Sequence, residues 1–197
     1  MTIQRKHAVI GGLWGLALLA LFAVAWVRVI GPKFEAGLAD TIGPGDYHLT
    51  TTGGEAFTEA TLKGSPSAIF FGFTHCPEVC PTSLGDIAAF QEELGDEKIR
   101  VFFVTVDPER DTVDQLRDYV GWAPGVQGVS GPREEIDKAI AAFRIYARRV
   151  PLEDGGYTMD HSANILLFDR KGRFFEPIGY QEDLERAVAK IRRLNAV

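Results

Sequence analysis

The sequence predicts an α/β fold with helices packed on a central mixed sheet, preceded by a single N-terminal transmembrane helix. Two continuous apolar runs, residues 67–73 and 99–106, are typical of strands buried on both faces of a sheet. Amphipathic stretches at helical spacing follow them along the chain. Near the N-terminus, residues 8–27 carry no charge, and a helix of about 20 residues spans about 30 Å, the thickness of a bilayer core.

Local signals place the elements of the α/β part in order. The expected strands are residues 45–49, 56–62, 67–73, 99–106, 143–150, 163–169 and 173–179, and the expected helices are residues 84–94, 113–122, 133–143 and 181–194. Gly53 and Gly54 predict a turn between the first two strands, and Gly95 ends the first helix. Thr112 and Gln115 form a capping box that begins the second helix. The last two strands form a hairpin, so the sheet is expected to be mixed.

The N-terminal apolar run determines the expected domain organisation. We expect a cytoplasmic tail (residues 1–7), a transmembrane anchor (8–30), a linker (31–45) and one domain (46–197). Arg5 and Lys6 precede the run, so the positive-inside rule keeps the N-terminus in the cytoplasm. A cleaved signal peptide is the alternative, because Ala23–Ala25 resembles a cleavage site, although such apolar regions usually have about 7–15 residues. A retained anchor predicts a single-pass protein of the cell inner membrane, with its C-terminal domain in the periplasm.

The charge distribution limits the kinds of partner. The chain carries a formal net charge of −6. Except for Glu35, every acidic residue lies at or beyond Asp40. The domain beyond the linker is therefore acidic. This charge argues against nucleic acid or an anionic lipid surface as a partner of the domain.

The stretch FGFTHCPEVCP, residues 71–81, holds the only two cysteines of the chain, Cys76 and Cys80. It follows the buried strand 67–73, so both thiols lie in a strand-to-helix loop, at the edge of the sheet where α/β proteins tend to bind ligands. Pro81 suits the first position of a helix, which makes Cys80 the expected N-cap. The unpaired N–H groups and the dipole of the helix would then lower the pKa of the Cys80 thiol.

Three kinds of site use two cysteines in this way: a structural disulfide, a redox couple and a pair of thiolate metal ligands. A disulfide between Cys76 and Cys80 would close a very small loop, which constrains the unfolded chain least. A redox couple of the thioredoxin type has two residues between its cysteines, whereas this stretch has three. The wider spacing favours a metal site, because both sulfurs can turn toward one point. A redox-active disulfide between the same two residues is the alternative state.

A two-thiolate site needs a further ligand, and the chain has four histidines. His7 lies on the cytoplasmic flank of the apolar run, and His48 lies in an expected strand. His75 is adjacent to the first cysteine, but the side chains of neighbouring residues usually diverge. His161 has Asp160 beside it, and a carboxylate is common near a metal-bound imidazole. On this local pattern alone, a histidine in a surface loop is the better explanation of His161.

Three segments together closely resemble the Sco/SenC family of copper chaperones: FGFTHCPEVCPTSL, VDPERDT and YTMDHSANILLFDRKGRF. They lie in the family's order and spacing, and the resemblance covers roughly residues 45–195. It implies a thioredoxin-like fold and a copper site formed by Cys76, Cys80 and His161. The acidic segment Asp107–Asp111 receives no ligand role, because a helix-capping turn explains it as well.

The resemblance also implies a function. The chain would be a membrane-anchored metallochaperone that assists assembly of the dinuclear copper centre of cytochrome c oxidase, with little or no enzyme activity of its own. Its partners would be the copper-bearing subunit of the oxidase, another copper chaperone as donor, and the membrane. Soft thiolates favour Cu(I), and one imidazole completes a site that also holds Cu(II). The alternative is a thiol:disulfide oxidoreductase that keeps the oxidase's copper-site cysteines reduced. His161 discriminates between them, because only copper binding needs it.

Overall fold

The computed structural model describes residues 2–26, 28, 37, 39–153 and 155–197, which fall into two units, one up to Ala39 and one from Asp40 to Val197. The first unit contains helix α1 (Thr2–Ala25). Among the residues described, no helix combines the length and the hydropathy that crossing a membrane requires. The expected anchor and linker lie partly outside the described residues.

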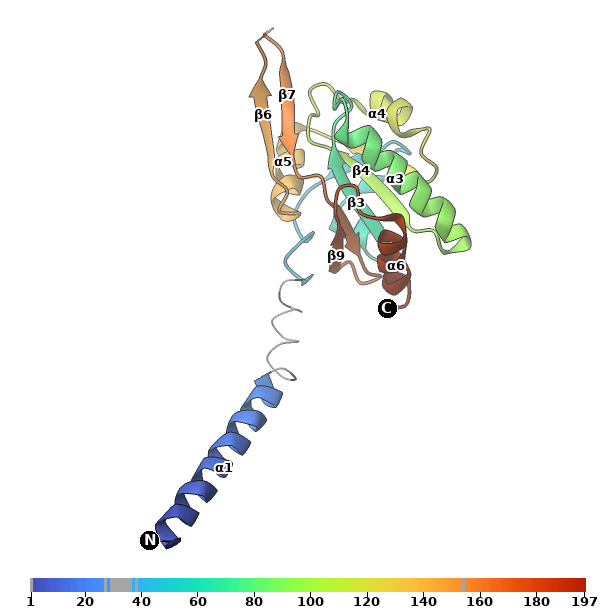
Figure 1. Cartoon of the computed structure of the whole chain (residues 1–197). Helices are drawn as coiled ribbons and strands as arrows, with labels where there is room; N and C mark the ends of the chain where they lie inside the picture. Colours follow the sequence, from blue (N-terminus) through green and yellow to red (C-terminus); the bar gives the residue numbers. More distant parts are fainter. Residues whose placement is uncertain (1, 27, 29–36, 38, 154) are drawn as a thin grey trace. The chain divides into compact units, whose positions relative to one another are not determined.

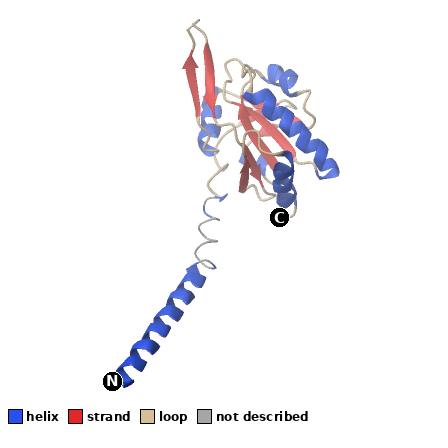
Figure 2. Cartoon of the chain, viewed as in Figure 1, coloured by secondary structure: helices blue, strands red, loops and turns tan. Residues whose placement is uncertain are grey.

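The second unit alternates strands and helices (Figures 1 and 2). Its strands are β1 (Leu49–Thr51), β2 (Ala56–Phe57), β3 (Ser67–Gly72), β4 (Arg100–Thr105), β5 (Val126–Ser130), β6 (Ala147–Pro151), β7 (Tyr157–His161), β8 (Ile165–Phe168) and β9 (Phe174–Ile178). Its α-helices are α3 (Val79–Leu94), α4 (Val113–Val120), α5 (Arg133–Ala142) and α6 (Leu184–Asn195). Short 3-10 helices cover Glu59–Leu62 and Gly95–Glu97.

Seven strands form the main sheet, in the order β2-β1-β5-β4-β3-β8-β9. The three central strands β5, β4 and β3 are parallel to one another, and the outer strands pair antiparallel. The predicted α/β fold with a central mixed sheet is therefore confirmed. Strands β6 and β7 form a separate two-stranded antiparallel sheet, which extends beyond the main sheet in Figure 1.

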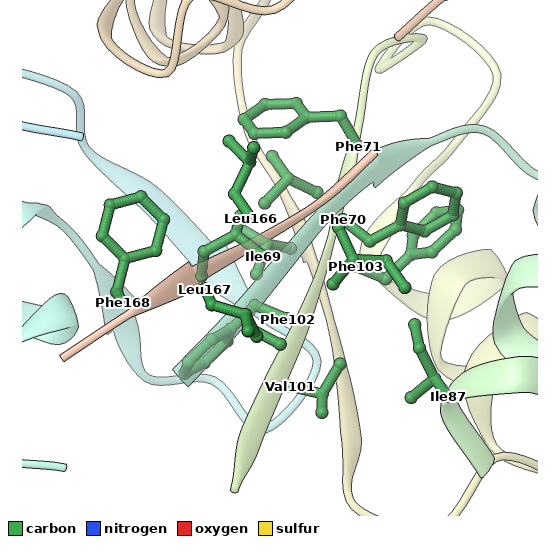
Figure 3. Close-up of a cluster of buried hydrophobic side chains, with 14 of the residues drawn as sticks. Ile69, Phe70, Phe71, Ile87, Val101, Phe102, Phe103, Leu166, Leu167 and Phe168 are labelled. Carbon is green, nitrogen blue, oxygen red and sulfur yellow. The ribbon is translucent and has the colours of Figure 1, made fainter. Parts of the chain in front are cut away.

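The core lies on both faces of β3, as the continuous apolar run of this strand predicts. Side chains alternate between the faces of a strand. On one face, Phe70 packs against Phe103 of β4, with 5.6 Å between the ring centroids, and α3 and α6 cover this side. On the other face, Phe71 packs against Phe143, which follows α5, and their centroids are 5.2 Å apart. Figure 3 shows Phe70, Phe71 and Phe103 with side chains of β8.

Burial of these aromatic side chains stabilises the arrangement. Phe70, Phe71 and Phe103 are fully buried. Each contributes roughly 1.5–3 kcal/mol relative to an exposed position. The rigid sheet therefore gives fixed positions to the ends of β3 and β4, where the cysteine loop begins.

Two strands were missing from the expected elements, and three were misplaced or too long. The strand expected at residues 45–49 begins only at Leu49, and the one expected at residues 56–62 covers only Ala56–Phe57 before the 3-10 helix Glu59–Leu62. Strand β5 was not predicted, because Gln127 and Gly128 interrupt its apolar pattern. Strand β7 was not predicted either, because its residues are half-buried at most. The run expected at residues 143–150 forms a strand only from Ala147, since Phe143 ends α5 and Arg144 adopts a positive φ of 54°.

The capping and turn signals at the start of α4, at the end of α3 and between β8 and β9 are confirmed. Thr112 and Gln115 form the predicted capping box at α4. Gly95 ends α3 with a positive φ of 57°, and Gly172 occupies the turn of the β8–β9 hairpin with a φ of 77°. Glycine adopts such angles without the strain that a Cβ atom would cause.

Candidate metal centre

The cysteine loop joins the end of β3 to the start of α3. The N–H of Cys76 donates to the carbonyl of Phe73 at 3.2 Å, which turns the chain sharply after the strand. The N–H of Cys80 donates to the Cys76 sulfur at 3.3 Å. Helix α3 begins at Val79, so Cys80 lies inside its first turn. Both sulfurs therefore belong to one short, hydrogen-bonded segment.

The prediction that Cys80 is the N-cap of the helix was wrong. The N-cap is Glu78, and Pro81 occupies the third helical position instead of the first. A proline is tolerated throughout the first helical turn, because the N–H that it lacks has no partner within the helix there. Pro81 therefore indicates only that the helix begins within the few residues before it, and does not identify the first helical residue.

Cys80 is fully buried against the end of β3. A Cβ atom added at Gly72 would lie 2.8 Å from the Cys80 sulfur and 2.7 Å from the Phe103 ring, which is closer than such contacts allow. The absence of a side chain at Gly72 therefore lets the sulfur lie directly over the strand. Cys76, in contrast, is partly exposed.

His161 is the last residue of β7, and its ring is fixed from two sides. Its Nδ1 lies 2.9 Å from the Ser162 carbonyl oxygen. A carbonyl only accepts, so Nδ1 donates to it, and Nε2 is the ring nitrogen that faces the cysteines. The ring also packs edge-on against Phe73, with centroids 5.7 Å apart and an interplanar angle of 88°. Asp160, expected beside the imidazole, lies instead 3.8 Å from Arg148.

Cys76, Cys80 and His161 come together at the end of the sheet. Their ligand atoms all lie within 4.8 Å of one another, and the Cys80 sulfur is 3.5 Å from His161 Nε2. The two cysteines are free thiols. Two sulfurs and one imidazole nitrogen are a donor set that suits copper. The three residues that the sequence analysis named thus form a group that could bind copper.

The two thiols of the group differ in acidity. A hydrogen bond from the Cys80 thiol, with further ones from His161 and from the backbone N–H groups of Cys80 and Glu78, lowers the pKa of Cys76 to about 4. The hydrogen bond with Cys76 and burial both raise the pKa of Cys80. The prediction of a lowered pKa at Cys80 was therefore wrong, because the thiolate is held at Cys76.

This difference predicts selective alkylation. We expect the rate of reaction of Cys76 with iodoacetamide to be nearly constant between about pH 6 and 8, because a thiol with a pKa of about 4 is already ionised there. An ordinary thiol, with a pKa of about 8.5, reacts roughly tenfold faster for each unit of pH over this range. Cys80 should stay unmodified while the protein is folded. Mass spectrometry of the modified peptides measures both rates, and a tenfold rise per unit at Cys76 would contradict the assignment.

The other described histidines lie outside the group. His75 is exposed, and its Nδ1 is 3.0 Å from the Thr74 hydroxyl and 3.9 Å from the Asp111 carboxylate. His48 is exposed and lies 3.1 Å from Asp46. Neither histidine belongs to the group of ligand atoms around the cysteines. Both side chains thus lie apart from the ligand group, and their exclusion as ligands stays a prediction.

Asp111 supports the cysteine loop, a role that was not predicted from the sequence. This carboxylate is fully buried and accepts hydrogen bonds from the backbone N–H of Thr74 at 3.0 Å and from its hydroxyl at 2.6 Å. The Thr105 hydroxyl also donates to it, at 2.6 Å. Asp111 thereby anchors the residues just before Cys76. One signal could have revealed it, since the loop that follows a buried parallel strand lies at the ligand-binding edge of the sheet, and Asp111 lies in the loop after β4.

Comparison with known proteins agrees with the fold and the site. Residues 36–196 match the family model of SCO1/SenC. The human "Protein SCO2 homolog, mitochondrial" is 33% identical over 199 residues, which cover 96% of this chain and 75% of the human protein. The Saccharomyces cerevisiae "Protein SCO2, mitochondrial" is 34% identical over 154 residues, which cover 75% of this chain. The chain spans only 51% of the length of that yeast relative.

Solved structures show the same architecture. Bradyrhizobium japonicum ScoI with copper bound is 45% identical with a TM-score of 0.71, and the match covers 78% of this chain and 99% of that one. Yeast Sco1 with copper bound is 31% identical with a TM-score of 0.71, covering 78% and 87% of the two chains. BsSco is described as a member of the Sco family of cytochrome c oxidase assembly proteins. Its TM-score is 0.60, and the match covers 77% of this chain and 92% of that one. At 20% identity, this likeness shows the fold alone.

The family model covers most of the chain, and the relatives and structures agree with it. The central sheet, the cysteine loop and the histidine that faces it all lie within the matched residues. The chain therefore belongs to the SCO1/SenC family.

Proposed function

We propose that this chain is a metallochaperone that holds copper between Cys76, Cys80 and His161 and passes it to the copper-bearing subunit of cytochrome c oxidase, for the dinuclear centre of that enzyme. The observation that carries the proposal is the convergence of two sulfurs and one imidazole nitrogen within 4.8 Å. Two similar structures, those of ScoI and yeast Sco1, have copper bound. Another copper chaperone would supply the metal.

The exposure of the three donors suits a cargo site. Cys76 and His161 are partly exposed, whereas Cys80 is buried. An incoming thiolate of a partner can therefore approach from the side of Cys76 and His161. Three protein donors leave room for a further ligand, so a partner can bind the metal before this chain releases it. Cys76 holds a thiolate, so of the two thiols only Cys80 must lose its proton on binding.

A second candidate function is thiol:disulfide exchange that keeps the oxidase's copper-site cysteines reduced. The partly exposed Cys76 thiolate beside the buried Cys80 thiol favours it. Cys76 would attack a disulfide of the partner, forming a mixed disulfide and releasing one partner thiolate. Cys80 would then lose its proton and attack the Cys76 sulfur, releasing the second partner thiolate. The partner gains two electrons, and this chain ends with a Cys76–Cys80 disulfide.

One comparison tests both functions. We expect the full chain, purified with its thiols reduced, to bind one copper ion per chain and to transfer it to a reduced, copper-free fragment of the oxidase subunit. Metal analysis and size-exclusion chromatography measure binding and transfer. The same chain is then mixed with the oxidised fragment, and its thiols are counted over time. A chain that reduces the fragment but binds no copper would replace the first function with the second.

We also propose that residues 8–30 anchor the chain in the cell inner membrane, with the domain in the periplasm. The support is the uncharged run of residues 8–27 and the positive charges of Arg5 and Lys6 before it. Protease added to the periplasmic side of intact spheroplasts is expected to digest the domain. A domain that is digested only after lysis would contradict this orientation.

A further inference from the structure

Two loops lie side by side at one edge of the main sheet. Strands β3 and β4 are parallel, and their last residues, Gly72 and Thr105, are paired. The chain after β3 carries the cysteines, and the chain after β4 forms the turn Asp107–Asp111. A backbone hydrogen bond of 2.8 Å from Val106 to Gly72 joins the two loops at their origin. Asp111 then holds Thr74 of the cysteine loop through the two hydrogen bonds described above.

The other end of the same turn holds the strand that carries His161. The Tyr157 hydroxyl donates to the buried carboxylate of Asp107 at 2.8 Å. Arg110 donates from Nη1 to the Tyr157 carbonyl at 3.0 Å, and its guanidinium lies 3.7 Å from the centre of the Tyr157 ring. Arg110 is itself held by Asp107, with 2.5 Å between Nε and the carboxylate. The turn therefore contacts both segments that supply the candidate ligands: the cysteine loop, through Thr74, and strand β7, through Tyr157.

Strand β7 depends on such contacts for its position. Within the part of the chain that the structure describes, β7 pairs only with β6 and shares no backbone ladder with the main sheet. An isolated pair of strands is marginally stable in water. Tyr157 and His161 lie four residues apart and so on the same face of the strand. Fixing Tyr157 therefore restricts where the imidazole of His161 can lie.

We propose that the turn Asp107–Asp111 is a positioning element that fixes His161 relative to Cys76 and Cys80. It does so through Tyr157 and Arg110 on one side and through Thr74 on the other. The role for the metal rests on the function proposed above, because the distance from Nε2 to the sulfurs determines whether the imidazole completes the copper site. A ligand that must be held in place from outside the site is sensitive to the loss of that support.

The test uses the full chain in detergent micelles, with its thiols reduced, and two conservative substitutions. Tyr157→Phe removes the hydroxyl donor and keeps the ring over Arg110. Arg110→Lys keeps the charge but loses the planar group that donates to Asp107 and Tyr157 together. For each variant we expect Cu(II) affinity to fall by about 10–100-fold, the usual cost of losing support around a metal ligand. Cu(I) affinity should fall much less, since two thiolates suffice for this soft ion.

A second readout requires no copper. In the metal-free reduced protein, nuclear Overhauser contacts between the His161 ring and the Cys80 β-protons report their separation, because Nε2 and the sulfur lie 3.5 Å apart. We expect these contacts to weaken in Tyr157→Phe and in Arg110→Lys. The matched control is Tyr47→Phe, which also removes a hydroxyl hydrogen bond, the one from Tyr47 to the Gly43 carbonyl at 3.1 Å. It should change neither the contacts nor Cu(II) affinity.

The outcomes separate the two proposals. Selective loss of Cu(II) affinity together with weaker contacts supports the positioning role. Unchanged contacts and Cu(II) affinity in both variants would overturn it, and so would equal losses for Cu(I) and Cu(II), or the same losses in Tyr47→Phe. A wild-type chain that binds no copper would refute the metallochaperone function, and the contacts measured without metal would still decide whether the turn positions His161.

Discussion

Replacing Cys80 with serine is expected to abolish both copper binding and thiol–disulfide exchange. A serine hydroxyl is a hard, neutral donor, so one of the two soft ligands is lost. The loss of Cu(I) affinity should exceed the roughly 10–100-fold that substitutions around a metal ligand cost. Exchange should stop at the mixed disulfide, because no second thiol remains to resolve it. In Cys80→Ala, which removes the hydrogen-bond donor as well, the pKa of Cys76 should also rise, since the Cys80 thiol is the largest cause of its lowered value.

The measurement compares Cu(I) affinity, by competition with a chromophoric chelator, and the rate at which an oxidised partner peptide is reduced. Cys80 is fully buried, so an unpaired hydroxyl there costs about 1–3 kcal/mol of folding free energy. Cys80→Ala is the control, because it removes the sulfur without burying a hydroxyl. Both variants should lose both activities, whatever their stability in urea. Wild-type Cu(I) affinity in Cys80→Ala would show that the buried sulfur is not a ligand.

Most of the fold could be predicted because its core strands carry their own signal. Strands β3 and β4 lie inside the sheet and consist of continuous apolar residues, and such runs identify buried strands. Strand β5 is also central but contains Gln127 and Gly128. Gly128 is needed because a Cβ atom there would lie 2.8 Å from Thr52 and 2.9 Å from Leu116. The glycine that interrupts the apolar pattern is thus required by a close contact between distant segments. No local pattern reveals such a contact, so this strand could not be predicted.

The site was predictable only in part. The spacing of Cys76 and Cys80 indicated a reactive pair, but the local pattern around His161 indicated a surface loop. The histidine and Cys80 are 81 positions apart, and only the tertiary fold brings Nε2 and the sulfur to 3.5 Å from each other. Only the resemblance to a family predicted that His161 joins the two cysteines in one site. Which thiol has the lowered pKa could not be predicted, because it depends on where α3 begins and therefore on which sulfur is buried.

Replacing His161 with alanine is expected to separate the two candidate functions. Imidazole is the only donor of the group that is not sulfur, so its loss leaves a two-thiolate site. Such a site still suits Cu(I), whereas Cu(II) prefers the nitrogen donor. Cu(II) affinity should fall by at least about 100-fold, beyond the cost of disturbing the surroundings of a ligand. Copper delivery to the oxidase subunit should fall with it.

Thiol–disulfide exchange should largely survive in His161→Ala. The largest cause of the lowered pKa of Cys76 is the hydrogen bond from Cys80, which the substitution leaves in place, while the smaller contribution of His161 is lost. The thiolate therefore persists near neutral pH, and its exposure is unchanged or greater. The assay counts thiols in the chain and in an oxidised partner peptide over time. An exchange rate that falls as far as Cu(II) affinity would show that the substitution disrupts the cysteine loop itself.

His75→Ala provides the matched control for this experiment. It also removes an imidazole close to Cys76, but His75 contacts Thr74 and lies outside the ligand group. Cu(II) affinity, the electron paramagnetic resonance signal of nitrogen bound to Cu(II), and copper delivery should all remain at wild-type levels in His75→Ala. The nitrogen signal should disappear in His161→Ala. If His161→Ala retains that signal and delivers copper like His75→Ala, the imidazole of His161 is only a loop side chain, and thiol–disulfide exchange becomes the better supported function.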